Sequence, residues 1–136
     1  MSEQSEVLKE RTMSFSIDVL RLIDRLPHSV AGDVVARQLA RSATSVAANY
    51  RSVCAARSRP DFVAKLSIVV EEAEECVYWL DLIVRAKLVE DALTLRREST
   101  ELRAIFSKSL GTARANRRAA ANSTHGWGQQ IVKSSH

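Results

Sequence analysis

Apolar residues recur at three- and four-residue spacing along most of this chain, a pattern that predicts long amphipathic helices. The pattern is clearest between residues 58 and 85. Its central stripe consists of Phe62, Leu66, Val69, Ala73, Cys76, Leu80 and Ile83, and a second row of Val63, Val70, Val77 and Val84 runs beside it. The two rows make an apolar face wider than a two-helix seam needs, so this helix is expected to contact more than one partner helix.

Three further helices are expected, at about residues 6–26, 34–56 and 91–115. Proline and capping residues mark their limits: Pro27 ends the first helix and Asp33 can cap the second. Four helices joined by short loops predict an all-α protein built as an antiparallel up-down-up-down four-helix bundle.

The bundle is expected to occupy residues 1–116, with Ser58 capping its third helix. Residues 117–136 are mostly small and polar, and they are expected to form a flexible, disordered or loosely attached basic C-terminal tail.

Charge is unevenly distributed along the chain, whose formal net charge is +4. Residues 1–101 hold 14 bases and 16 acids, whereas residues 102–136 hold six bases and no acid, so the two parts carry −2 and +6. A basic end on a near-neutral body suits RNA, DNA or another polyanion, and it is equally typical of a solubilising tail.

Arginines also form a row on one predicted helix. Arg37, Arg41 and Arg51 lie within about 80° of one another on a face that is not the apolar one. The segment 71–81 of the next helix has five acids and no base. Two interpretations remain open: the row contacts nucleic-acid phosphates, or it pairs with these acids on a neighbouring subunit. The candidate nucleic-acid-binding residues are Arg37, Arg41, Arg51, Arg114, Arg117 and Arg118.

A candidate subunit interface lies on the third predicted helix. Trp79 falls on the flank opposite the valine row, with Tyr78 beside it, and Glu72 and Glu75 lie near the core edge where they can pair between helices or between subunits. Asn49 lies at the boundary between the core and the arginine row. We interpret it as a structural polar group that fixes helix register, in preference to a ligand contact.

No catalytic constellation stands out. A carboxylate metal site in a helix bundle needs Glu-x-x-His motifs, and none of His28, His125 and His136 follows a glutamate by three residues. Cys54 and Cys76 lie on apolar stripes, about 18 Å apart by helix geometry, which predicts neither a disulfide nor an activated thiol. We therefore expect no enzyme activity, metal, cofactor or small-molecule substrate. The chain has no apolar signal core or membrane-spanning run, so a cytoplasmic protein is expected.

Residues 41–83 carry a family resemblance. Arg41 is followed by Ser-Val-Ala-x-Asn at residues 45–49, and a Glu-rich segment covers residues 71–80. The chain resembles, over about residues 7–115, a bacterial four-helix-bundle family first noticed as reading frames inside intervening sequences of 23S ribosomal RNA genes. Many members read N-I-A-E-G where this chain has Asn-Tyr-Arg-Ser-Val at residues 49–53.

The resemblance implies a four-helix bundle that forms a cyclic homo-oligomer, a pentamer. Relatives include the accessory variability determinant of diversity-generating retroelements, a basic barrel that binds nucleic acid and reverse transcriptase. Most members have no established biochemical activity. The sequence thus leaves two functions open: a homo-oligomeric accessory protein that binds nucleic acid through basic surface residues, and a structural protein–protein assembly module that does not.

Overall fold

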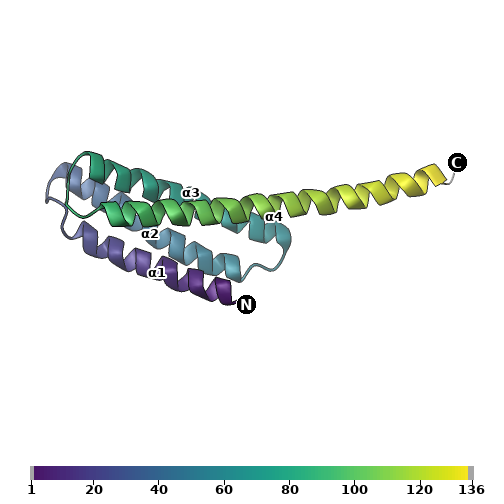
Figure 1. The fold of residues 1–136 in the computed structure, drawn as a ribbon, viewed down its shortest axis with the longest axis horizontal. Coiled ribbons are helices and arrows are strands. Elements are labelled where there is room, and N and C mark those ends of the chain that lie inside the picture. Colours follow the sequence, from purple (N-terminus) through teal and green to yellow (C-terminus); the bar gives the residue numbers. More distant parts are fainter. Residues whose placement is uncertain (1, 135–136) are drawn as a thin grey trace.

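The computed structural model describes the backbone of residues 2–134 and the side chains of residues 2–123. This part of the chain contains four α-helices and no strand: α1 (Glu3–Ile23), α2 (Val30–Cys54), α3 (Arg59–Arg85) and α4 (Leu93–Ser134). Consecutive helices run in opposite directions (Figure 1). The predicted all-α four-helix bundle is confirmed.

Each of the first three helices begins at a serine cap. The side-chain oxygens of Ser2, Ser29 and Ser58 accept hydrogen bonds from the backbone N–H three residues further on, at 3.1, 3.1 and 3.2 Å. Such a bond satisfies one of the N–H groups that a helix start leaves without a partner. The prediction for Ser58 is confirmed.

The cap of α2 differs from the prediction. Ser29, not Asp33, caps the helix, which therefore begins at Val30, and Asp33 lies in its first turn. Gly32 makes this earlier start possible, because a Cβ atom there would lie 1.9 Å from the carbonyl oxygen of Pro27. The preceding loop folds back so closely on α2 that only glycine fits.

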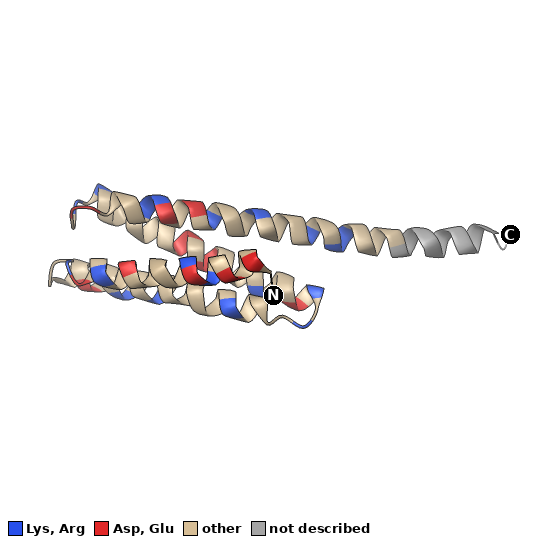
Figure 2. Cartoon of the chain, turned by 60° about the horizontal axis from the view of Figure 1, so that its bottom comes forward, with Lys and Arg blue, Asp and Glu red and all other residues tan. Residues whose placement is uncertain are grey.

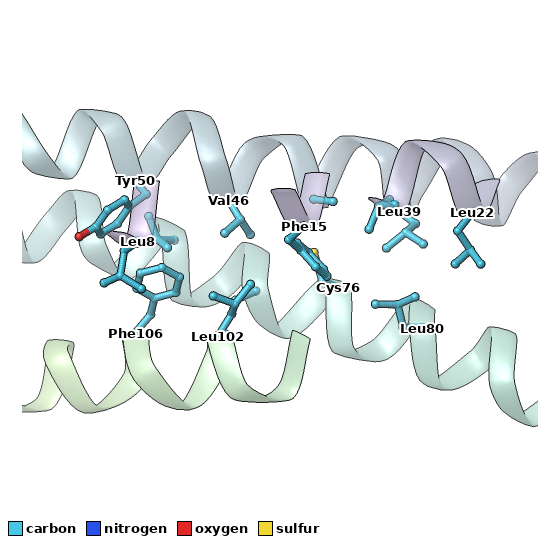
Figure 3. Close-up of a cluster of buried hydrophobic side chains, with 14 of the residues drawn as sticks. Leu8, Phe15, Leu22, Leu39, Val46, Tyr50, Cys76, Leu80, Leu102 and Phe106 are labelled. Atoms are coloured by element: carbon cyan, nitrogen blue, oxygen red, sulfur yellow. The ribbon is translucent and has the colours of Figure 1, made fainter. Parts of the chain in front are cut away.

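Side chains from all four helices meet in one core (Figure 3). The members drawn and labelled are Leu8, Phe15 and Leu22 of α1, Leu39, Val46 and Tyr50 of α2, Cys76 and Leu80 of α3, and Leu102 and Phe106 of α4. The central apolar stripe predicted for the third helix is thus buried, apart from the half-buried Phe62. Buried hydroxyl groups bond backbone carbonyls, as where Ser16 Oγ donates to Ala43 O of α2 at 3.0 Å. No buried side-chain nitrogen or oxygen in the described residues lacks a partner.

The helices enclose the core unequally. α3 packs extensively against both α2 and α4, as its wide apolar face predicted, whereas α1 packs mainly on α2 and touches α4 much less. A charged clamp joins the α1–α4 seam: Arg11 donates to both carboxylate oxygens of Glu98, at 2.9 and 2.6 Å, and to Glu101 at 2.6 Å. This bidentate geometry is the strong form of an arginine–carboxylate contact.

The last helix is much longer than predicted. It was expected to end near Ala115, but α4 continues to Ser134, so the expected boundary between residues 116 and 117 falls inside a helix. The reason lies in residues 113–121, where alanine and arginine favour helix and no glycine or proline interrupts it. The segment still leaves the bundle, as a loosely attached tail would, but it does so as a continuing helix (Figure 1). None of the helices, within the residues described, is long and apolar enough to cross a membrane.

The core contribution of α3 can be tested by truncation. Leu80 is completely buried, and we expect Leu80→Ala to lower the free energy of unfolding by about 3 kcal/mol through reduced burial and the cavity left behind. Urea denaturation followed by circular dichroism measures this. Leu93→Ala is the matched control, because Leu93 is 46% exposed and should cost less than about 1 kcal/mol. Equal losses in the two variants would contradict the assignment of the core.

Candidate polyanion-binding surface

Beyond Arg96, the basic side chains on the described part of α4 have no acidic partners. Within residues 2–123, every ion pair involves a base at or before Arg96. The bases that follow on the described part of α4 are Arg97, Arg103, Lys108, Arg114, Arg117 and Arg118, and none has a carboxylate within 4.0 Å in that part of the chain. Figure 2 shows blue segments without red ones along this half of the helix. The surface there is uniformly positive.

Three of these arginines form a shallow hollow. Arg114, Arg117 and Arg118 line about 410 Å³ of space together with Val63 of α3. The Arg114 guanidinium donates a hydrogen bond to Ser67 Oγ of α3 at 3.2 Å, which directs it toward the neighbouring helix. Arginine presents several donors in a planar fork that matches phosphate oxygens, so such a cluster suits a polyanion. These three predicted residues are brought together by the structure.

The three arginines of the α2 row differ in whether an acid of α3 pairs with them. Arg37 and Arg51 are exposed and have no carboxylate partner among the described residues. Arg41 instead binds Glu72 of α3, with its Nη1 3.2 Å from both carboxylate oxygens, and also binds Glu75. Of the two pairings that the sequence left open for Glu72 and Glu75, the structure contains the interhelix one within a single chain.

Burial and charge act in opposite directions in this cluster. The hydrogen bonds that Arg41 donates to Glu75 and Glu72 raise the pKa of Arg41. Partial burial raises the pKa of Glu72, while Arg41 acts to lower it and Glu75 to raise it. The contact with Arg41 alone would lower the pKa of Glu72. Desolvation at the edge of the core outweighs this effect, so the pKa of Glu72 is raised. Arg41 therefore reduces, but does not remove, the cost of ionising Glu72.

The aromatic pair on α3 divides between core and surface. Trp79 is half-buried and packs against the core, whereas Tyr78 is 58% exposed. Their ring centroids are 4.8 Å apart in an edge-to-face arrangement. Tyr78 is therefore the available member of the predicted interface pair.

Asn49 is half-buried on α2, and its Nδ2 donates to Ser45 O of the same helix at 2.8 Å. This bond lies within one helix, so it does not itself link α2 to α3.

A further apolar surface was missed in the sequence. Met13, Ile17 and Leu20 lie on the outer face of α1 and are 38%, 40% and 44% exposed. Their four- and three-residue spacing would have revealed a second apolar row, had the helix not been assigned a single buried stripe. α1 lies diagonally across the bundle from α3, since the backbones of these two helices do not approach each other closely. Exposed apolar side chains therefore occur on two opposite sides of the molecule.

The described residues contain no group of three His, Cys, Asp or Glu side chains that could hold a metal ion. Burial raises the pKa of the Cys76 thiol to about 12, which leaves it protonated and unreactive at neutral pH.

Comparison with known proteins identifies relatives of this arrangement. The family described as 23S rRNA-intervening sequence protein matches residues 3–108. A solved structure from Bacteroides thetaiotaomicron, described as a protein with unknown function from the S23 ribosomal protein family, is 31% identical. The match covers 79% of this chain and 97% of that one, with a TM-score of 0.70. No curated protein matches the chain significantly.

The Arg41 cluster predicts a pH-dependent stability change. A carboxyl whose pKa is raised on folding stabilises the protein when protonated, and that contribution disappears as pH rises from the unfolded pKa through the folded one. Arg41 offsets this effect at Glu72. We therefore expect Arg41→Gln to lower the free energy of unfolding by about 1 kcal/mol at pH 7 and by less at pH 4. Urea denaturation at both pH values measures the difference.

Arg37→Gln is the control for this experiment, because Arg37 is exposed on the same helix and has no described carboxylate partner. It should change stability little at either pH. A destabilisation by Arg41→Gln that is larger at pH 4 than at pH 7 would show that the carboxylates do not depend on this arginine.

Proposed function

The chain belongs to the 23S rRNA-intervening sequence protein family, and we propose that it is a non-enzymatic, homo-oligomeric protein that binds nucleic-acid backbones through the basic side chains of α4. The observation that carries this proposal is the absence of carboxylate partners for the α4 bases within residues 2–123 that follow Arg96. Elsewhere in the described chain, most arginines and lysines are paired with acids. A basic side chain without a carboxylate partner is free to contact a phosphate group of a nucleic acid.

The arrangement of these bases supports backbone contacts. Arg114, Arg117 and Arg118 lie within about 100° on one face of α4, beside Val63 near the start of α3. Contacts of this kind release counterions and give affinity with little sequence preference. Arg37 and Arg51 are secondary contacts in this proposal. Arg41 is left out, because Glu72 and Glu75 already neutralise it.

Self-association rests on the two exposed apolar surfaces. A cyclic ring is built from heterologous contacts, in which one patch of each subunit meets a different patch of the next. A heterologous contact needs two different patches on each subunit, and the outer faces of α1 and α3 both carry exposed apolar side chains, including Ile17 and Tyr78. We propose that these two faces meet between subunits, in a ring of the size that the family resemblance implies. A ring would repeat the α4 surface once per subunit.

The second candidate function is an assembly module without nucleic-acid binding. The Arg41 cluster favours it, because it shows arginines and acids of this chain satisfying one another. In that case the bases of α4 would serve solubility alone. Nucleic-acid binding at low salt separates the two functions.

Neutralising the α4 arginines should weaken binding to all sequences alike. We expect Arg114→Gln, Arg117→Gln and Arg118→Gln combined to lower affinity for single- and double-stranded oligonucleotides at least about ten-fold. The slope of log affinity against log salt should become shallower by roughly 2–3, because each phosphate that the protein neutralises adds about 0.7–0.9 to that slope. Fluorescence anisotropy at several salt concentrations measures both quantities.

The control for this triple variant is Arg41→Gln. The charge of Arg41 is already neutralised by Glu72 and Glu75, so this variant should leave affinity and salt slope nearly unchanged. If the intact oligomer binds neither type of oligonucleotide at low salt, the nucleic-acid proposal is wrong and the assembly module remains.

A mixing experiment tests the ring interface. We expect Ile17→Glu and Tyr78→Glu each to reduce the mass measured by light scattering to that of a monomer, since each places a charge in an apolar contact. An equimolar mixture should form dimers, because each variant keeps the face that is disrupted in the other. Val7→Glu is the control, since Val7 is 58% exposed on a different side of α1. A mixture that stays monomeric, or a wild-type monomer at tens of micromolar, would contradict the heterologous ring.

A further inference from the structure

The two ends of the bundle are closed differently. At the end that holds the α1–α2 and α3–α4 loops, Leu26 and Ala92 are buried and Leu88 and Val89 pack against the core. At the other end only residues 55–58 cross the bundle, and their sequence, Ala-Ala-Arg-Ser, offers no large apolar side chain. At this second end, therefore, no large apolar side chain of the loop covers the core.

A pocket of about 600 Å³ lies at this end, between the first turn of α1, the α2–α3 loop and the middle of α4. Its floor is the core itself, formed by Leu8, Val53, Leu66 and Phe106. Figure 3 shows Leu8, Tyr50 and Phe106 together at one end of the buried cluster. Pockets that hold small molecules have volumes of roughly 300–1,000 Å³ and mostly apolar walls, so this one has suitable size and lining.

The rim of the pocket is positive. Arg57 and Arg59 line it, and none of its lining residues is acidic. Arg59 has no carboxylate within 4.0 Å in the described part of the chain. Two acids lie near this rim, and both are paired. Asp61 is bound to Lys65 at 2.9 Å and accepts a hydrogen bond from the Arg57 backbone N–H. Glu6, which acts electrostatically on Tyr50, is bound to Lys9 at 3.3 Å. The first turns of two helices, α1 and α3, also open on the pocket, and helix N-termini favour anions.

The inner wall offers neutral polar groups. Burial raises the pKa of the Tyr50 phenol to about 12, so this group is neutral at physiological pH. The Tyr50 ring packs against Phe106 with ring centroids 5.2 Å apart and the planes tilted by 43°, which places an aromatic surface on this side of the pocket. The half-buried Cys54 thiol lies on the same wall.

We propose that this pocket binds a small organic anion. An apolar ring or chain of the ligand fills the space above Phe106 and Leu66, and a single carboxylate, sulfonate or phosphate group faces Arg57 and Arg59. An apolar floor of this kind gives water few hydrogen-bond partners, and the acid-free arginine rim selects a negative group. The site is separate from the surface proposed for nucleic acid, because Arg114, Arg117 and Arg118 do not line it.

The first test compares two probes that differ in charge. Isothermal titration calorimetry with 1-anilinonaphthalene-8-sulfonate should give one site per chain. Arg59→Gln should weaken its binding about five-fold, while binding of N-phenyl-1-naphthylamine, which has the same rings and no sulfonate, should not change. Arg37→Gln, on the solvent face of α2, is the control and should affect neither probe. Equal effects of Arg59→Gln on both probes would overturn the anion site.

The second test locates the probe. Saturating sulfonate probe should slow alkylation of Cys54 by iodoacetamide at least about five-fold, as followed by mass spectrometry, with buried Cys76 as the unreactive reference. Ser109→Phe fills the pocket and should abolish probe binding, whereas Ser107→Phe, at an exposed position of the same helix outside the lining, should retain it. The proposal is overturned if Cys54 is not protected in the wild-type protein. The proposal is also overturned if Ser109→Phe changes the oligomer mass and leaves probe binding unchanged. That result would mean that a second copy of this chain, and not the probe, occupies the pocket.

Discussion

The wide apolar face of α3 is the feature on which the rest of the structure depends. Val69, Cys76, Leu80 and Ile83 are completely buried along it, and together with its flanking rows this face packs on α2 and α4 at once. Since α3 occupies the position between them, α1 must complete the core from the diagonal position. α1 is then fixed mainly by α2 on one side and by the Arg11 clamp on the other. Its outer face is left with apolar side chains that no helix of the same chain covers.

Charge follows from the same arrangement. The acids all precede residue 102, and within the bundle they meet bases across helix boundaries, as Glu98 meets Arg11 and Asp81 meets Arg96. α4 enters the bundle beside these acids and leaves it beyond their reach. The same helix is therefore neutralised at its beginning and positive along its later turns. The net charge of the chain is small, but the acids and the unpaired bases lie on different parts of it. Because α4 is continuous, positive charge is concentrated toward one end of the molecule.

Much of the fold could be predicted from local pattern, because helix periodicity and the Ser58 cap depend on residues close in sequence. The start of α2 was missed because it depends on how closely the Pro27 loop approaches Gly32, which is a tertiary contact. The length of α4 was missed because polar composition was given more weight than helix propensity. At the surface, the shared face of Arg37, Arg41 and Arg51 followed from periodicity. Two features depend instead on the relative rotation of the helices, which the pattern of a single helix does not contain: which of these arginines contacts a carboxylate, and which side chains line the pocket.

The length of α4 has a consequence for its dynamics. Its 42 residues extend about 63 Å, and only the first part is supported by other helices. An unsupported helix depends on its own hydrogen bonds and is marginally stable in water. Amide hydrogens near Leu102 and Phe106 are therefore protected by the stability of the whole bundle, whereas those beyond Arg118 are protected only by a local helix–coil equilibrium. One continuous helix thus contains amides with two different mechanisms of protection from hydrogen exchange. A polyanion bound along its later turns would extend the strongly protected part toward the C-terminus.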